Sequence, residues 1–128
     1  MTVREAIARA EALLPGHASP EEEEDPRWQA IIAVGNFIQT NPDEVWPFTL
    51  RWGCSDDADL RSAIATCVLE HLLEHHFDSY ITGVEEAVRS RPLFADTFSR
   101  CWKLGQAEEA GRAARFDRLM GSAKHRDR

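Results

Sequence analysis

The feature that most limits the fold of this chain is an internal repeat. A shift of 34 residues places Val34 on Val68, Ile38 on Leu72 and Trp46 on Tyr80, so apolar positions coincide along two successive segments. A repeat near this length is typical of stacked helical hairpins, in which each hairpin covers the apolar face of its neighbour. The sequence therefore predicts an all-α chain.

Capping residues mark helix boundaries along most of the chain. A T-x-x-E capping box begins at Thr2, and Asp25 followed by Pro26 is typical of a second helix start. Helices are expected over about 2–15, 25–38, 41–53, 55–76, 78–92, 93–105 and 106–120, with a kink at Pro47. The predicted fold is a short right-handed α-solenoid of six or seven helices, stacked as antiparallel hairpins.

Length and charge restrict the classes of function. The 128 residues are expected to form one domain over 1–122, followed by a frayed basic tail over 123–128. Acidic residues number 22 against 15 basic ones, so neither nucleic acid nor an anionic membrane is an expected partner. Without a long apolar run or a signal-peptide core, a cytoplasmic protein with reduced cysteines is expected.

Two segments at the repeat period resemble the HEAT-like repeats. They are Asp25 to Gly35, DPRWQAIIAVG, and Asp57 to Ala65, DADLRSAIA, and both look like the start of that family's second helix. The resemblance covers residues 25 to 105. It implies that Asp25, Arg27, Asp59 and Arg61 tie adjacent repeats together, and that the chain is a scaffold for a partner protein rather than an enzyme.

The string EHLLEHH at residues 70–76 contains an H-x-x-E-H pattern formed by His71, Glu74 and His75. Inverted zinc peptidases use this pattern, with two histidines on the metal and the glutamate activating water. A metal-dependent hydrolase is therefore one alternative, and an adventitious metal is another. The pattern lacks a third protein ligand, and on a helical wheel both histidines fall in the apolar arc of Ile64 and Val68. The preferred interpretation is packing histidines, with no metal or cofactor.

The expected second helices of the repeats also carry a polar stripe. Solenoids commonly present such a face as a concave binding surface. The candidate binding residues are Asn36, Thr40, Thr66, Glu70, Glu74, Arg100 and Lys103, with Gln29, Thr97 and Glu108 on the same stripe. The predicted function is a non-enzymatic protein-interaction module, either an adaptor or a small acidic scaffold. An immunity-type neutraliser of a basic toxin is a further alternative, and the oligomeric state stays open.

Three further features have two interpretations each. Core packing is expected for Trp28, Trp46, Trp52 and Trp102, since three of them fall on apolar stripes, although aromatic clusters can also form ligand sites. The acidic loop 21–25 is expected to be solvated, or to dock a basic partner. The six basic residues of 112–128 are expected to complement the protein's own acidic surface, or to bind an acidic partner.

Overall fold

The computed structural model describes residues 1–20 and 24–126, and no β-strand occurs among them. The elements are α1 (Val3–Leu13), α2 (Pro26–Gly35), α3 (Pro42–Trp52), α4 (Ala58–Ile64), a π-helical turn η1 (Ala65–Leu69), α5 (Glu70–Ser90), α6 (Pro92–Ser99), a 3-10 turn η2 (Gly105–Glu108) and α7 (Ala110–Arg126). The prediction of an all-α chain is confirmed. None of the described helices has both the length and the apolar character needed to cross a membrane.

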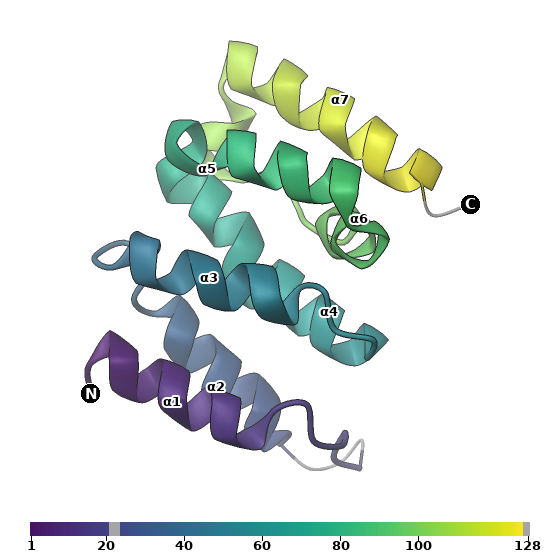
Figure 1. The fold of residues 1–128 in the computed structure, drawn as a ribbon. Helices are drawn as coiled ribbons and strands as arrows, with labels where there is room; N and C mark the ends of the chain where they lie inside the picture. Colours follow the sequence, from purple (N-terminus) through teal and green to yellow (C-terminus); the bar gives the residue numbers. More distant parts are fainter. Residues whose placement is uncertain (21–23, 127–128) are drawn as a thin grey trace.

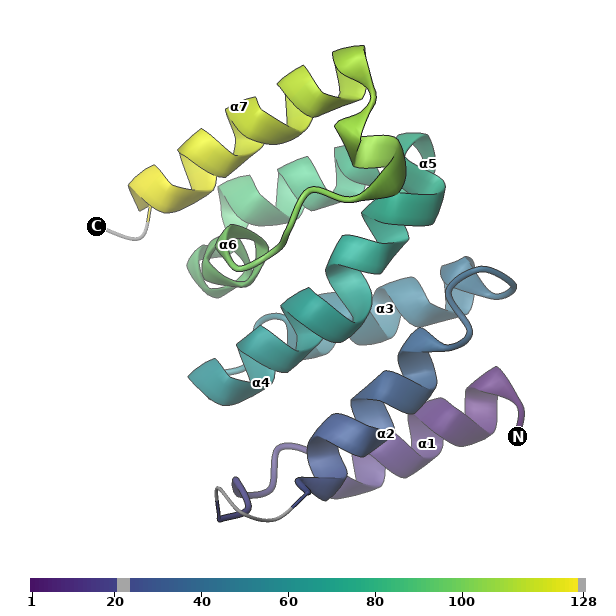
Figure 2. The same ribbon diagram turned by 180° about the vertical axis from the view of Figure 1, so that it is seen from behind.

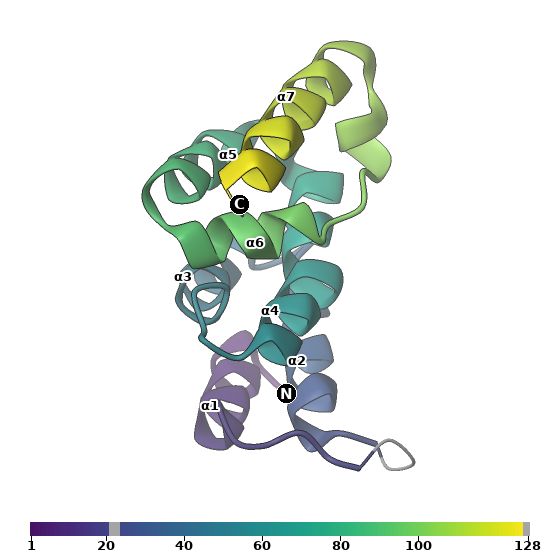
Figure 3. The ribbon, with the colours of Figure 1, turned by 90° about the vertical axis from the view of Figure 1, so that its right-hand side faces the viewer.

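The helices follow one another from one end of the molecule to the other (Figure 1). Helices α1 and α2 pack together at one end, and α6 packs against α7 at the opposite end. Figure 2 shows α2, α4 and the first part of α5 on one face, while α1 and α3 lie behind them. The edge view in Figure 3 separates the same two rows. The face formed by α2, η1 and α5 carries the site described below.

The expected caps are present at the first two helices. The Thr2 hydroxyl accepts from the Glu5 backbone N–H at 3.1 Å, while the Glu5 carboxylate accepts from the Thr2 backbone N–H. The Asp25 carboxylate accepts from the backbone N–H of Arg27 at 2.9 Å, and Pro26 occupies the first helical position. Both helix starts were therefore predicted correctly, because cap chemistry is local to a few residues.

Buried apolar side chains form one core through all the helices. Trp52 is buried, and Trp28 and Trp46 are half-buried against this core, which confirms the expectation for three of the four tryptophans. Trp102 is the exception, with 72% of its surface exposed. Pro47 lies inside α3 without dividing it into two helices.

The last helix extends beyond residue 122, after which the sequence predicted a frayed tail. Helix α7 continues to Arg126, because Ala123 adds a fully buried methyl group to the contact with the core. Residues 127–128 of the expected tail lie outside the described residues. Two of the six basic residues of 112–128 pair with acids of α5: Arg112 with Asp78 at 2.7 Å, and Arg115 with Glu85 at 2.6 Å. For these two residues the prediction of self-complementation is confirmed.

Arg27, at the start of α2, contacts the segment that follows α1 and the start of α4. Its guanidinium is 3% exposed and reaches Asp25 and Asp57 at 3.1 Å, Asp59 at 2.8 Å and the backbone oxygen of Pro15 at 2.9 Å. One repeat further on, Arg61 makes the corresponding contact with Asp96 of α6 at 2.7 Å. Arg27, Asp59 and Arg61 thus lie at contacts between alternate helices, and Asp25 pairs with Arg27 at the start of α2.

These ion pairs change the acid strength of the carboxyl groups. Burial acts to raise the pKa of Asp25 and of Asp57, but hydrogen bonds from Arg27 and from backbone N–H groups outweigh it, and both pKa values lie below their usual range. A lowered pKa in the folded state means that the unfolded chain binds protons more readily. The contribution of this cluster to stability is therefore present above about pH 4, the ordinary range of Asp, and is lost as the pH falls through the lowered values.

The long helical segment from α4 to α5 is irregular in two places. The π turn η1 inserts one extra residue per turn between α4 and α5. Further along, His76 has φ −139° and ψ 46°, which bends α5 at that residue. The sequence predicts a helix end at His76 and a new start at Asp78, and the position of this break is confirmed.

The side chain of Gln106 occupies the bend. Its amide nitrogen donates to the His75 carbonyl at 2.7 Å, and its amide oxygen accepts from the Phe77 backbone N–H at 3.0 Å. A broken helix leaves a carbonyl and an N–H without partners, and each such buried group is costly. A single primary amide satisfies both groups, so η2 and α5 are joined at this point.

Replacement of Arg27 by Met should destabilise the fold by about 3 kcal/mol, because it keeps the aliphatic stem but leaves three carboxylates without their cation. Urea unfolding at neutral pH measures the loss. The matched control is Arg9→Met on the exposed side of α1, which should change stability by less than about 0.5 kcal/mol. Equal stabilities for the two variants would contradict a structural role for the Arg27 cluster.

Replacement of Gln106 by Met should lower the free energy of unfolding by about 1 to 3 kcal/mol, since two backbone groups at the bend lose their partners. Thermal and urea unfolding measure the change. Gln29→Met, at an exposed position of α2, is the control for the substitution itself. Hydrogen exchange at the Phe77 amide should accelerate in the Gln106 variant only; unchanged protection there would argue against the amide bridge.

Candidate functional site

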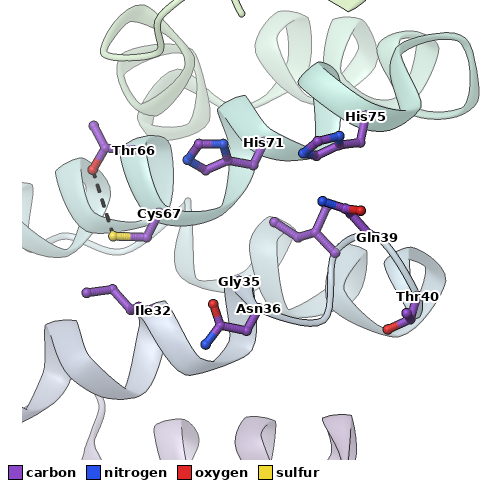
Figure 4. Close-up of a pocket in the computed structure, with 10 residues that line it drawn as sticks. Ile32, Gly35, Asn36, Gln39, Thr40, Thr66, Cys67, His71 and His75 are labelled. Carbon is purple, nitrogen blue, oxygen red and sulfur yellow. Dashed lines mark hydrogen bonds between the residues drawn. The ribbon is translucent and has the colours of Figure 1, made fainter. Parts of the chain in front are cut away.

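A groove of about 690 Å³ lies between the end of α2 and the helical segment η1–α5. Figure 4 shows its two walls, with the turn that follows α2 on one side and the histidines of α5 on the other. Its lining residues are Ile32, Gly35, Asn36, Ile38, Gln39, Thr40, Thr66, Cys67, His71 and His75. None of them is an Asp, Glu, Lys or Arg, so within the described chain the groove presents apolar side chains, side-chain amides, hydroxyls, a thiol and two imidazoles.

Gly35 sets the distance between the two walls. A Cβ atom placed on Gly35 would overlap the backbone oxygen of Cys67 on η1. Only a residue without a side chain therefore allows this close approach of α2 to the π turn. At the bend in α5, the His76 ring nitrogen Nε2 lies 3.0 Å from the Ile38 backbone oxygen. In the tautomer that carries its proton on Nε2, His76 donates to this oxygen. Both contacts hold the turn 36–40 against α5.

His71, Glu74 and His75 form a polar cluster on the α5 wall. The Glu74 oxygen Oε1 lies 2.7 Å from His71 Nδ1 and 3.3 Å from His75 Nε2. Both histidine side chains are 36% exposed, so they face the groove and are not packed in the apolar core as predicted. Among the described residues, no group of three or more His, Cys, Asp or Glu side chains is arranged to hold a metal ion.

The π turn explains why the histidines are not where the helical wheel placed them. A regular helix advances about 100° per residue, so one extra residue in η1 rotates every later side chain by about that angle. The core face of α4 continues through Ile64 and Val68, but beyond the turn Leu72 and Leu73 are the residues with no exposed surface. The positions that the wheel assigned to the core are thereby turned toward the groove.

The same rotation moves Glu70 away from the binding stripe, which corrects its predicted exposure. Glu70 is 6% exposed, and its carboxylate accepts from the backbone N–H of Trp102 at 3.1 Å. Burial raises its pKa, although the hydrogen bond from Trp102 acts in the opposite direction. Glu70 is therefore an internal anchor for the loop after α6 rather than a binding residue.

The rest of the predicted stripe is divided between two places. Asn36, Thr40 and Thr66 line the groove, as the repeat shift indicates. Arg100 lies instead beside α4, where it contacts Ser62 at 2.7 Å and Asp96 at 3.0 Å, and Lys103 pairs with Asp117 of α7 at 3.0 Å. The structure thus does not bring the seven candidate residues onto one continuous surface, since the bend at His76 redirects the second half of the chain.

Five of the groove residues were not predicted as site residues: Ile32, Gly35, Ile38, Gln39 and Cys67. Gln39 lies in the turn beyond the predicted helix end, and a polar residue in a turn carries no distinctive signal. Cys67 is half-buried beside Thr66, and burial raises the pKa of its thiol. A thiol with a raised pKa is a poor nucleophile at neutral pH. Cys67 therefore contributes shape and apolar surface to the groove.

Two side-chain amides in the groove have hydrogen-bonding groups to spare. Asn36 and Gln39 are exposed, and within the described part of the chain neither side chain makes a hydrogen bond. A primary amide offers donors and an acceptor in the arrangement of a peptide group. The groove can therefore bond to a polypeptide backbone while Ile32, which is 40% exposed, offers apolar contact at the same wall.

Of the predicted acidic loop 21–25, the described residues Glu24 and Asp25 do not line the groove. Residues 21–23 lie outside the described residues, and Asp25 caps α2 and pairs with Arg27.

Comparison of the chain with protein-family models, with curated proteins and with solved structures finds no match. The function must therefore be argued from the geometry of the site.

Substitutions of Glu70 test whether its side chain is a buried anchor or an exposed surface residue. Glu70→Lys buries a cation where the Trp102 N–H needs an acceptor, and should cost about 2 to 4 kcal/mol of stability. Glu70→Gln keeps an acceptor oxygen and should lie within about 1 kcal/mol of the native chain at neutral pH. Urea unfolding measures both, and a Glu70→Lys variant as stable as Glu70→Gln would contradict the buried placement.

The pH dependence of the same variant is a second readout. Because the pKa of Glu70 is raised in the folded state, its favourable contribution is complete below the unfolded pKa and is lost as the pH rises through the folded value. Glu70→Gln should remove this loss. Its stability relative to the native chain should therefore increase from acid to neutral pH.

Proposed function

We propose that this chain is a small HEAT-like α-solenoid that binds a partner protein through the groove between α2 and α5. The observation that carries the proposal is a groove lined without Asp, Glu, Lys or Arg, together with the two side-chain amides that have no partner within the described chain. Such a surface matches an extended, uncharged segment of polypeptide, whose backbone groups need donors and acceptors in alternation.

The rigidity of the walls supports binding rather than catalysis. Close contact at Gly35, the His76 contact with the turn and the Gln106 bridge hold both walls, so little ordering is needed when a segment enters. Preorganised sites bind with a lower entropic cost. No nucleophile in the groove has an activating base, since the thiol of Cys67 has a raised pKa and contacts Thr66.

The metal-dependent hydrolase is a weaker proposal for the same groove. His71, Glu74 and His75 do lie together, but a tight zinc site needs three or four protein ligands, and here the Glu74 carboxylate contacts the ring nitrogens of the two histidines. Elemental analysis of the purified native protein separates the two proposals. About one zinc per chain, lost on His71→Ala, would favour the hydrolase.

The test uses a groove variant, Asn36→Arg with Gln39→Arg, and a charge-matched control, Ala8→Arg with Ala114→Arg, at exposed positions of α1 and α7. Proteins captured from the native host by each form are quantified by mass spectrometry, and the affinity for a recovered partner is measured by calorimetry. The groove variant should bind at least about tenfold more weakly with an unchanged melting temperature, because two buried cations are added at the contact.

The control should bind as the native chain does. Equal loss in both variants would show a non-specific effect of charge, and normal binding by a stable groove variant would exclude this groove as the partner site. A recovered partner that is a basic nuclease or toxin, bound normally by the groove variant, would favour the neutraliser interpretation and direct attention to the acidic loop 21–25.

A further inference from the structure

A second surface, at the opposite end of the molecule from α1, has a different chemistry. A cleft of about 390 Å³ lies between the loop that follows α6 and the C-terminal half of α7. The apolar part of its lining is Trp102, Phe116 and Met120, and the charged part is Arg100, Lys103 and Lys124. It shares no lining residue with the groove between α2 and α5. Figure 2 shows α6 nearly end-on below α7, so the two helices cross, and the loop that follows α6 runs from there toward the start of α7.

Trp102 is exposed although the loop that carries it is firmly held. Its backbone N–H donates to buried Glu70, and the thiol of the preceding residue, Cys101, donates to the Ala65 carbonyl at 3.6 Å. At the other end of the loop, Gly105 has φ +52° and packs so closely on Glu74 that a Cβ atom would collide with it. The backbone is therefore fixed while the indole, 72% exposed, faces solvent.

An exposed tryptophan on a rigid support is costly in water and favourable at an interface. Large aromatic side chains on preorganised backbones are the commonest sites of high binding energy between proteins. The base of the cleft is equally well supported, because the Phe116 ring packs on Phe98 with ring centroids 5.1 Å apart. An apolar side chain of a ligand can thus lie on Trp102 and Met120 without moving either wall.

The charge of the cleft selects the kind of ligand. The chain as a whole has a net charge of −7, yet this cleft is lined by three cations and, among the described residues, by no Asp or Glu. Arg100 and Lys103 are partly neutralised by Asp96 and Asp117. Lys124 is exposed and makes no ion pair within the described part of the chain, so it is the cation best able to meet a ligand carboxylate.

We propose that this cleft binds a short acidic segment of a partner protein with one aromatic or aliphatic side chain, which stacks on Trp102 while a neighbouring carboxylate pairs with Lys124. A short segment fits better than a nucleic acid, because Asp96 and Asp117 border the cleft and a longer polyanion would run onto them. The proposal does not depend on the groove between α2 and α5, and its test is separate.

The experiment titrates the full chain with a synthetic peptide that has a single Phe between short runs of Asp and Glu. Binding is followed by the indole N–H resonance of Trp102, which is assigned by its absence from Trp102→Phe. We expect a saturable shift of this resonance that weakens at high salt, since part of the attraction is electrostatic. A peptide with Ala in place of Phe should bind at least about fivefold more weakly, because it lacks the stacking contact.

Matched variants locate the site. Trp102→Ala and Lys124→Glu should each weaken binding by about tenfold, measured by fluorescence anisotropy of a labelled peptide. Arg9→Glu on α1 makes the same charge change far from the cleft and should bind nearly normally, as should the groove variant Asn36→Arg with Gln39→Arg. Unchanged melting temperatures show that each variant is folded.

Three results would overturn the proposal. They are the absence of a saturable shift with the Phe peptide, equal binding by Trp102→Ala and the native chain, and a stronger affinity for a single-stranded oligonucleotide than for the acidic peptide. The last result would identify a nucleic-acid site. Failure of the groove variant to lose its partner bears only on the proposed function and leaves this outcome unaffected.

Discussion

The irregular backbone of the long helical segment α4–η1–α5 determines most of what is distinctive in this structure. A continuous straight helix would carry one apolar face along its whole length, and the second half of the chain would pack in the same direction as the first. The π turn rotates the core face, and the bend at His76 redirects the axis. The bend leaves backbone groups without helical partners, which is tolerated because Gln106 bonds to the Phe77 N–H and the His75 carbonyl.

Packing and polar anchors act together at this segment. Gly35 allows α2 to approach η1, and Gly105 allows the loop after α6 to approach Glu74. Glu70 then fixes that loop through the Trp102 N–H. The groove and the cleft are therefore products of one arrangement, because the rotation that turns His71 and His75 toward the groove also turns Glu70 toward the loop that carries Trp102.

Many of the charged side chains form ion pairs that join helices. Arg27 is surrounded by three aspartates, Arg61 meets Asp96, and two arginines of α7 pair with acids of α5. These pairs connect alternate helices of the chain: α2 with α4, α4 with α6, and α5 with α7. What is left for recognition is a groove lined without Asp, Glu, Lys or Arg and a small basic cleft, two chemically different surfaces on a chain with excess acid.

The structural elements that depend only on neighbouring residues could be predicted from the sequence. Capping boxes, the Pro26 start, the break near His76 and the apolar stripes of the helices are all local, and the all-α class and most helix boundaries follow from them. The resemblance to HEAT-like repeats implied that Arg27, Asp59 and Arg61 lie at contacts between repeats, and the repeat shift placed Asn36, Thr40 and Thr66 on one stripe. These successes share one physical basis, since a cap or a regular helical face needs no knowledge of distant segments.

Contacts between distant segments set which side of α5 faces the groove and which residues act as anchors. The π turn is stabilised by the close approach of Gly35 and by packing on several helices, so no local pattern in residues 65–69 announces it. A helical wheel drawn with a constant 100° step therefore exposed Glu70 and buried the histidines. Gln106, which lies 29 residues from Phe77, acquires its role solely because the fold brings it to the bend. Residues whose function depends on such a contact cannot be recognised until the chain has folded around them.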